Sequence, residues 1–259
     1  MVEAPAMLFL ADVGNTSASF GFYRRGRLTG VKHVSSDEFP TILGKLIANE
    51  KIDSNLSLVM SSVSPKITRK IRAAIKKKQR LKDRFWVIGE EITVPLRHKY
   101  ISIHKLGSDR LANAYGAIRQ YGAPLLILDY GTAITCDYIS KKGIFMGGLI
   151  IPGPEISLKA LSEKAALLPP IEFPRQYRPF IGRDTRGGMK AGILQGYGAM
   201  TDGLVERFRR RFKGRFQVIA TGGVARVIYP YTHKIDILDP HLTLKSLVLI
   251  FKDRLKIPS

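Results

Sequence analysis

Two short segments of the chain combine an aspartate, a glycine and hydroxyl or amide side chains in the manner of phosphate-binding turns. They are Asp12-Val13-Gly14-Asn15-Thr16 and Asp129-Tyr130-Gly131-Thr132-Ala133. Glycine lets the backbone turn sharply, and the N–H groups exposed by such a turn suit phosphate, as do nearby hydroxyls. A carboxylate beside them suits a cation. One such segment alone is common turn chemistry, whereas two that face each other could hold a nucleoside triphosphate.

Each turn needs a strand to hold it, and the sequence supplies one in both places. Apolar runs at residues 7–11 and 125–128 predict buried strands that end at the two aspartates. A strand, a hairpin and a second strand follow each turn, at residues 17–23, 28–34, 135–139 and 144–151. The same order of elements therefore occurs twice, which indicates an internal duplication.

The remaining pattern predicts an α/β chain with two halves. Further helices and strands are expected at residues 39–49, 56–61, 85–88, 109–121, 188–212, 217–220 and 244–255. We place the boundary near Gly122, which gives domains 1–121 and 122–259. Two duplicated α/β halves around a nucleotide cleft are typical of the acetate and sugar kinase/actin-like superfamily, whose domains are ribonuclease-H-like.

The composition is that of an ordinary globular protein, apart from its charge. The 259 residues are 45% hydrophobic and carry a formal net charge of +21. Cys136 is the only cysteine, which excludes an internal disulfide and a cysteine metal cluster. No apolar run approaches the roughly 18 residues of a membrane span, and the start lacks the basic segment of a signal peptide. We therefore expect a cytoplasmic protein with no membrane partner.

Much of the positive charge lies in two segments, residues 66–84 and 206–215, which have the apolar spacing of amphipathic helices. They are interpreted as solvated helix faces, or alternatively as a surface that binds polyanions. The sequence contains no zinc-finger, RNA-recognition or basic-zipper signature. Any nucleic-acid binding is therefore expected to be weak and non-specific.

Five motifs follow one another in the order and spacing of a known family. They are the two phosphate turns, Gly107-Ser108-Asp109-Arg110, Gly147-Gly148-Leu149-Ile150-Ile151-Pro152-Gly153 and Thr221-Gly222-Gly223. Together they resemble the motifs of the type III pantothenate kinases, and the resemblance covers nearly the whole chain. It implies an enzyme that uses ATP to phosphorylate pantothenate to 4′-phosphopantothenate, the first step of coenzyme A biosynthesis.

The resemblance also implies roles for single residues. Asp109 corresponds to the general base that takes the proton of the acceptor hydroxyl. Asp129 corresponds to the site of a monovalent cation, potassium or ammonium, while magnesium arrives on the nucleotide. The implied ATP contacts are Asp12, Val13, Gly14, Asn15, Thr16, Ser17, Ala18, Ser19, Thr132, Gly222 and Gly223. The implied pantothenate contacts are Tyr100, Gly107, Ser108, Asp109, Arg110 and Thr185, the last reaching the partner subunit's substrate in a homodimer.

The residues themselves leave simpler interpretations open. Asp109 and Thr185 each stand where a helix N-cap is expected, and Tyr100 is also compatible with an amphipathic surface position. The family commonly has Asn and Pro where this chain has Ser102 and Ile103. We expect Ser102 to keep a side-chain bond in the turn. The loss of proline loosens the loop by about 0.4–1 kcal/mol if the conformation is otherwise unchanged.

Two other functions remain as alternatives. One is a non-catalytic accessory factor in transcription that binds nucleic acid through the basic helices. The other is a kinase for a different small hydroxylated substrate, which the change at Ser102 and Ile103 would allow. The joint presence of Asp12, Asp109 and Asp129 favours the pantothenate kinase, because a protein that only binds has no need of all three.

Overall fold

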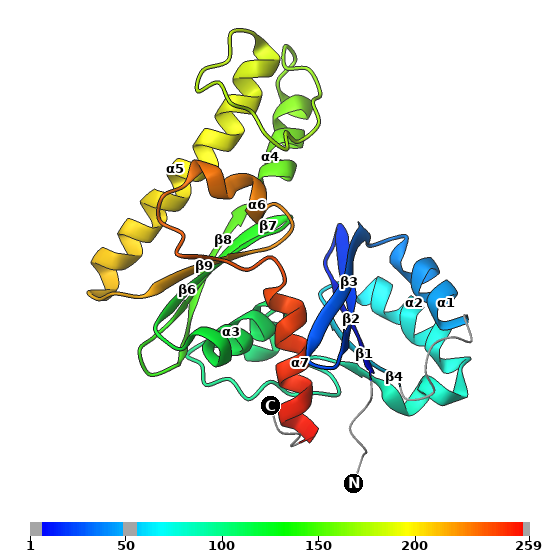
Figure 1. Ribbon diagram of the computed structural model, residues 1–259. Coiled ribbons are helices and arrows are strands. Elements are labelled where there is room, and N and C mark those ends of the chain that lie inside the picture. The colour runs from blue at the N-terminus through cyan, green and yellow to red at the C-terminus, as the bar shows by residue number, and fades with distance from the viewer. Residues whose placement is uncertain (1–6, 49–55, 256–259) are drawn as a thin grey trace. The chain divides into compact units, whose positions relative to one another are not determined.

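The computed structural model describes residues 7–48 and 56–255, and they form two compact units (Figure 1). The first unit contains Met1–Tyr121 together with His241–Ser259, and the second contains Gly122–Pro240. The chain passes from the first unit to the second at Gly122, where the sequence predicted the boundary. The expected second domain, 122–259, differs, because its last segment belongs to the first unit.

The first unit contains a mixed sheet, which has five strands in the order β3-β2-β1-β4-β5 among the described residues. Strand β1 pairs antiparallel with β2 and parallel with β4; β3 pairs antiparallel with β2, and β5 parallel with β4. The hairpin between β2 and β3 turns at Arg25 and Gly26, whose φ angles are 49° and 79°. Positive φ at both positions is typical of a two-residue hairpin turn. The strands are Met7–Val13, Ser17–Arg24, Arg27–Ser35, Leu56–Ser62 and Phe85–Val87, numbered β1 to β5.

Helices cover both faces of this sheet. Helices α1 (Phe39–Ala48) and α2 (Pro65–Lys76) bury their apolar side chains against one face, where they meet Phe9, Ala11 and Val13 of β1. Side chains alternate along a strand, so Leu8, Leu10 and Asp12 point to the other face. Helices α3 (Ser108–Tyr121) and α7 (Leu242–Leu255) contact that part of the sheet. Asp12 therefore lies on the face of α3 and α7.

The second unit repeats this topology. The order of its strands is β10-β9-β6-β7-β8 within the described part of the chain; β6, β9 and β10 run parallel, whereas β6, β7 and β8 form antiparallel neighbours. Read from the other edge, this is the order of the first sheet, so the predicted duplication is confirmed. The strands are Leu125–Tyr130, Ala133–Ile139, Phe145–Pro152, Gln217–Thr221 and Ile237–Leu238, numbered β6 to β10.

Three helices accompany the second sheet: α4 (Pro154–Lys164), α5 (Thr185–Phe212) and the short α6 (Ala225–Ile228). Leu194 and Val205 of α5 are fully buried in a core that includes Tyr138 of β7. The sequence predicted α5 but not α4. Its start carries a recognisable signal, since Gly153 is the N-cap and Pro154 stands in the first turn, where proline is tolerated.

Both basic segments are helical over only part of their length. Buried Ile67, Ile71 and Ile75 recur every four residues on α2, and this apolar spacing stops after Ile75. The helix accordingly ends at Lys76 rather than continuing to Arg84, and a 3₁₀ segment, Gln79–Arg84, follows. In the described residues no helix is both long and apolar enough to cross a membrane.

The C-terminal helix, α7, joins the first unit through close contacts with β5 and α3. Phe251 of α7 lies 5.0 Å from the ring of Trp86, measured between centroids. Asn113 of α3 accepts a hydrogen bond of 2.8 Å from Thr243 Oγ1. Gly116 leaves room for the helix, because a Cβ atom there would stand 1.8 Å from Ser246 Oγ and 2.9 Å from Ser246 Cα.

We therefore predict that Gly116→Ala lowers the free energy of unfolding by about 1–3 kcal/mol, because the added methyl group overpacks the α3–α7 contact. Gly44→Ala is the matched control, since Gly44 also lies in a helix of this unit and no described atom comes within 4 Å of its Cβ position. That substitution should stabilise by up to about 1 kcal/mol through helix propensity. Urea unfolding of both variants checks the pair, and equal stabilities would contradict the packing argument.

Candidate functional site

A row of polar side chains crosses the first sheet at Asp12. In the strand register Asp12 stands opposite Ser19 of β2 on one side and Ser61 of β4 on the other, and Ser19 stands opposite His33 of β3. Residues directly opposite each other share a face of the sheet. Ser19 Oγ and His33 Nδ1 are 2.8 Å apart. The sheet thus presents His33, Ser19, Asp12 and Ser61 side by side.

The turn after Asp12 is held by a backbone bond within it and by the side chain of Ser36. The Gly14 N–H donates to the Ser17 carbonyl at 3.0 Å, and Ser36 Oγ donates to the Gly14 carbonyl at 2.8 Å. Asn15, Thr16 and Ser17 are exposed at its tip. The turn therefore presents polar side chains from a fixed backbone, which is what an anion site of the predicted kind requires.

Asp109 is brought to the same sheet edge by hydrogen bonds of its neighbour. Ser108 Oγ lies 3.0 Å from Ser61 Oγ, accepts a hydrogen bond of 3.0 Å from the Ser62 N–H and donates one of 3.1 Å to the Ser62 carbonyl. These bonds attach the start of α3 to the end of β4. Since Ser61 stands beside Asp12, the two carboxylates come from adjoining parts of one unit.

The carboxyl group of Asp109 has a raised pKa, because partial burial removes water from its charged form. The Arg110 N–H donates to Asp109 Oδ1 at 2.7 Å, and this bond and the charge of Arg110 lower the pKa in part. Asp109 lies within the first turn of α3. Gly107 leaves room for this carboxyl group, because a Cβ there would stand 2.3 Å from Asp109 Oδ1 and would displace it. A carboxylate with a raised pKa is suited to accept a proton near neutral pH.

Tyr100 and Arg110 lie together, with the Arg110 guanidinium 5.8 Å from the centre of the Tyr100 ring. Between them in sequence is a 3₁₀ turn, Ile103–Lys105, for which Ser102 is the preceding residue. The expected side-chain bond of Ser102 is not the one formed. Its backbone carbonyl instead accepts from the Lys105 N–H at 2.9 Å, so the turn does not depend on which short polar residue stands there.

In the second unit Asp129 lies against the Thr221-Gly222-Gly223 turn. Asp129 at the end of β6 pairs with Thr221 of β9. Gly222 has φ = 94°, and a Cβ there would stand 2.4 Å from Asp129 Oδ1 and 2.6 Å from the Tyr130 carbonyl oxygen. Only glycine fits this position, and it leaves two oxygen atoms from different groups beside the same turn.

The turn that carries Thr132 packs against the start of α4. The Gly153 N–H donates to the Thr132 carbonyl at 2.9 Å, and a Cβ on Gly153 would stand 2.3 Å from the Gly131 carbonyl. Thr132 itself is exposed. A helix N-terminus beside this turn adds N–H groups and a partial positive charge that favour an anion.

Thr185 is the first residue of α5, but it is not the cap of the helix. Asp184 is the N-cap, and its Oδ1 accepts from the Gly187 N–H at 2.8 Å. The N-cap interpretation of Thr185 is therefore wrong by one residue, and the exposed Thr185 side chain is not used for capping. Asp184 and Arg183 line a hollow of about 680 Å³ with Tyr177, Pro179, Phe180 and Ile181.

Comparison with known proteins decides what these residues belong to. The family model described as type III pantothenate kinase matches residues 8–207. The type III pantothenate kinase of Bacillus cytotoxicus is 37% identical over 254 residues, which are 95% of this chain and 96% of that protein. The chain belongs to the type III pantothenate kinase family.

Solved structures agree with this type III pantothenate kinase family fold. A protein from Campylobacter jejuni described as a Baf family transcriptional activator superposes with a TM-score of 0.59 at 20% identity, covering 96% of this chain and 99% of that one. A protein from Sinorhizobium meliloti described as a 2-dehydro-3-deoxygalactonokinase gives 0.58 at 10% identity, with 97% and 98% covered. At these identities the likeness concerns the fold, which is the predicted sugar-kinase architecture.

Several residues that shape the site of this family member are not part of the motifs that predicted it. No role was predicted for Ser61, Ser62 or His33, although two serines at the end of an apolar strand are a usable signal.

No group of three or more His, Cys, Asp or Glu side chains with metal-binding geometry occurs among the described residues.

We predict that Gly222→Ala destabilises the protein by about 1–3 kcal/mol or more, because alanine is strained at positive φ and its methyl group overlaps Asp129 and Tyr130. Gly223→Ala is the matched control, since no described atom lies within 4 Å of its Cβ position. Thermal unfolding of both variants measures the difference. Equal melting temperatures for the two variants would refute the close approach of Gly222 to Asp129.

Proposed function

We propose that this chain transfers the terminal phosphate of ATP to pantothenate, giving 4′-phosphopantothenate, the first step of coenzyme A biosynthesis. The observation that carries the proposal is Asp109, a carboxyl group of raised pKa at a helix start attached to the sheet edge of Asp12. Membership of the type III pantothenate kinase family fixes the class of reaction as ATP-dependent phosphorylation.

The proposed mechanism divides the work between a base and an anion site. Phosphoryl transfer depends mainly on positioning and on neutralising charge. Asp109 accepts the proton of the pantothenate hydroxyl as that oxygen attacks the terminal phosphate. The N–H groups and hydroxyls of residues 12–19 hold the phosphates, with magnesium arriving on the nucleotide and supplying positive charge there.

We assign pantothenate recognition to Tyr100, Gly107, Ser108 and Arg110, with Asp109 at the reacting hydroxyl. Arg110 is only 6% exposed and lies over the Tyr100 ring, so its charge is held in one place. A cation so positioned suits the carboxylate of pantothenate. We assign further ATP contacts in the second unit to Thr132, Gly222 and Gly223.

Asp129 is the proposed site of a monovalent cation. Asp129 Oδ1 and the Tyr130 carbonyl oxygen both lie against Gly222, so the donors available there are oxygen atoms. Oxygen donors with a single carboxylate fit potassium or ammonium. The bound cation would supply positive charge beside the Thr132 turn.

We also propose a homodimer in which Thr185 reaches the partner's substrate. Helix α5 exposes Gly188, Gly192 and Gly196 at intervals of four residues, with no described atom within 4 Å of their Cβ positions. Phe180 and Ile181, just before this helix, are each 73% exposed. A smooth helix face beside exposed apolar side chains is typical of a subunit interface.

The accessory-factor alternative is not favoured, because a kinase family matches most of the chain. The basic face of α2 is exposed at Lys66, Arg69, Lys70 and Lys76. Its contact with nucleic acid is proposed to be weak and non-specific. Such non-specific binding should show a DNA affinity that falls steeply as the salt concentration rises, because it releases counterions.

We predict that Asp109→Asn lowers the turnover number by about 10²–10⁴, because the amide cannot accept the proton. In the wild-type enzyme the acid limb of kcat/KM against pH should lie above the ordinary aspartate pKa of about 3.9, since the base works only when deprotonated. Stability should not fall in the variant, because a raised carboxyl pKa means that the charged form costs folding energy above that pKa.

Asp83→Asn is the control for Asp109→Asn, since Asp83 is exposed in the same unit. It should leave turnover and its pH dependence unchanged. Near-wild-type turnover of Asp109→Asn, in a protein shown to be folded by circular dichroism, would remove Asp109 from the role of base.

We predict that activity requires potassium or ammonium in addition to magnesium, and that Asp129→Asn loses this requirement together with most of the activity. The reason is the loss of the one carboxylate assigned to the cation. Initial rates are measured in potassium and in sodium at constant ionic strength. Full activity in sodium alone, with Asp129→Asn indistinguishable from wild type, would exclude the proposed cation site.

The dimer is tested by complementation. Thr185→Val and Asp109→Asn are each expected to have low activity as pure proteins. Mixed dimers should contain one site with both Asp109 and the partner's Thr185, so an equimolar mixture should recover about a quarter of wild-type activity. No recovery after subunit exchange shown by mass, or an active monomer at micromolar concentration, would contradict a site completed in trans.

A further inference from the structure

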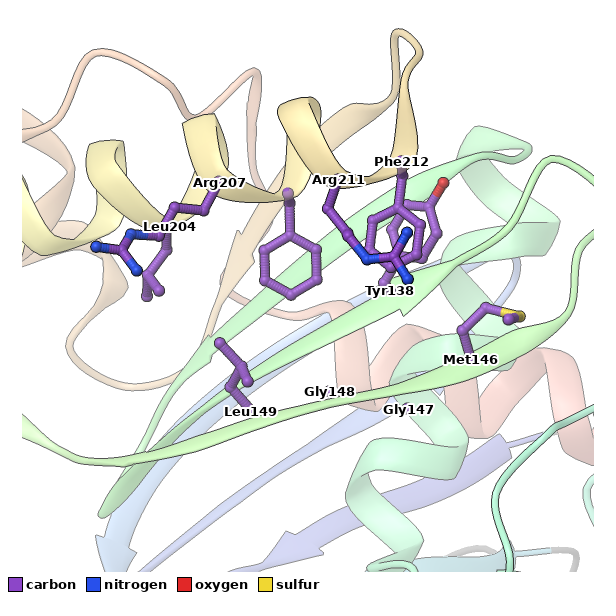
Figure 2. A pocket seen from close by; sticks show the side chains of 10 residues that line it. Tyr138, Met146, Gly147, Gly148, Leu149, Leu204, Arg207, Arg211 and Phe212 are labelled. Atoms are coloured by element: carbon purple, nitrogen blue, oxygen red, sulfur yellow. The ribbon is translucent and has the colours of Figure 1, made fainter.

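The second unit contains a hollow that the proposed kinase chemistry does not use. It has a volume of about 410 Å³ and lies between the β7–β8 hairpin and the C-terminal half of α5 (Figure 2). This volume is within the range of small-molecule sites, about 300–1,000 Å³. Its lining consists of Tyr138, Met146, Gly147, Gly148, Leu149, Leu204, Arg207, Phe208, Arg211 and Phe212.

The hollow exists because the strand beneath it has no side chain at the centre. Gly147 pairs with Tyr138, so a side chain on Gly147 would project to the same face as the tyrosine, toward α5. Gly147 has φ = 108°, which restricts the position to glycine. The register shifts after Tyr138, and Met146 is the extra residue. The backbone thus forms the floor, and neighbouring side chains form the walls.

The walls are apolar and well packed. The rings of Tyr138 and Phe212 stack with centroids 3.9 Å apart and an angle of 18° between their planes. Phe208 lies 5.8 Å from Phe212, and Leu204 continues the same side of α5 (Figure 2). Leu149, on the opposite wall, is 40% exposed. An aromatic wall held by stacking suits the hydrocarbon part of a ligand.

Two arginines border this apolar surface, and the part of the chain that the structure describes places no acidic partner beside them. Arg207 and Arg211 are one helical turn apart on α5, and no carboxylate of the described residues lies within ion-pair distance of either. Glu206, the nearest acid in sequence, is paired with Lys234 at 2.8 Å instead. Cations near a helix C-terminus are common, but here they flank a hollow that lacks any acidic side chain.

The hollow is separate from the residues assigned to ATP. Ala133, next to Thr132, pairs with Pro152, whereas Tyr138 pairs with Gly147 five positions further along the hairpin. At the rise of an antiparallel strand this is about 17 Å. A ligand in the hollow therefore does not occupy the Thr132 turn.

We propose that this hollow binds a small anionic amphiphile, meaning a carboxylate or sulfonate on a hydrocarbon body. The hydrocarbon lies over Gly147 against the aromatic wall, and the anionic group lies at the rim. The side chains of Arg207 and Arg211, which point apart in Figure 2, turn toward it there. The apolar lining selects the hydrocarbon body, and the two arginines select the anionic head group. A neutral molecule of the same shape contacts the apolar wall but makes no charged contact with the arginines.

The experiment is calorimetric titration of the full-length protein with laurate, kept below its micelle concentration. We expect saturable binding of one laurate per chain. The double variant Arg207→Gln/Arg211→Gln should weaken it by about tenfold or more, because charge-assisted bonds are lost. Arg210→Gln is the matched control, since Arg210 is an exposed arginine of the same helix that does not line the hollow. Its affinity for laurate should stay within about twofold of wild type.

Three outcomes would overturn the proposal. One is absence of saturable binding by the wild type, and another is equal loss of affinity in the double variant and in Arg210→Gln. The third is a halving of the molecular mass on adding laurate, seen by sedimentation, which would mean that a second copy of the chain normally fills the hollow. Cosedimentation with phosphatidylglycerol vesicles separates a free ligand from a membrane surface, and binding there that needs Arg207 and Arg211 would also overturn it.

The variants also separate this site from the kinase. Because the hollow lies about five residue pairs along the hairpin from the Thr132 turn, the double variant should keep wild-type kinase turnover while it loses affinity for laurate. Dodecanol supplies the same chain without the charge, so its affinity should not differ between wild type and the double variant. A loss of dodecanol binding in that variant would indicate a damaged hollow and would contradict a role for the two charges.

Discussion

The parallel pairing of β1 with β4 is the constraint on which the first unit depends. It sets Asp12 beside Ser61, and the hydroxyl contact between Ser61 and Ser108 then fixes where α3 begins. A shift of one residue in this register would turn Asp12 into the apolar layer of Phe9 and Val13, beside α1 and α2. The buried strands therefore do more than form a core, because their register decides which face receives the carboxylate.

Much of this was predictable from the chain alone, and the reason is local. An apolar run followed by Asp-x-Gly marks a strand and its turn within a few residues, so β1, β6 and both turns were found. What failed was non-local. The bonds of Ser108 to β4, and the return of α7 to the first unit, depend on pairing between segments far apart in sequence.

The two repeats share a topology and differ in how their turns are supported. In the first repeat a side chain, Ser36, closes the turn by donating to Gly14. Both turns also accept a backbone bond. It runs from the Ser36 N–H to the Thr16 carbonyl in the first repeat, and from the Gly153 N–H, ahead of α4, to the Thr132 carbonyl in the second. In the second repeat Gly222 also approaches Asp129 closely. The sequence motif does not reveal this contact, because it depends on the backbone angle of Gly222, φ = 94°. The two repeats thus keep a backbone bond to the turn and differ in the residue that donates it, a serine in the first and the glycine at a helix start in the second.

The return of α7 to the first unit has a consequence for biosynthesis. Residues 122–240 are a continuous stretch, so the second unit is complete in sequence before the last helix has been made. During translation the first unit is therefore completed after the second, because α7, which contacts α3 and β1, is synthesised last. Until residues 242–255 have left the ribosome, the first sheet lacks the helix that packs on the face of Leu8 and Leu10, and an exposed apolar face of this kind is prone to aggregate.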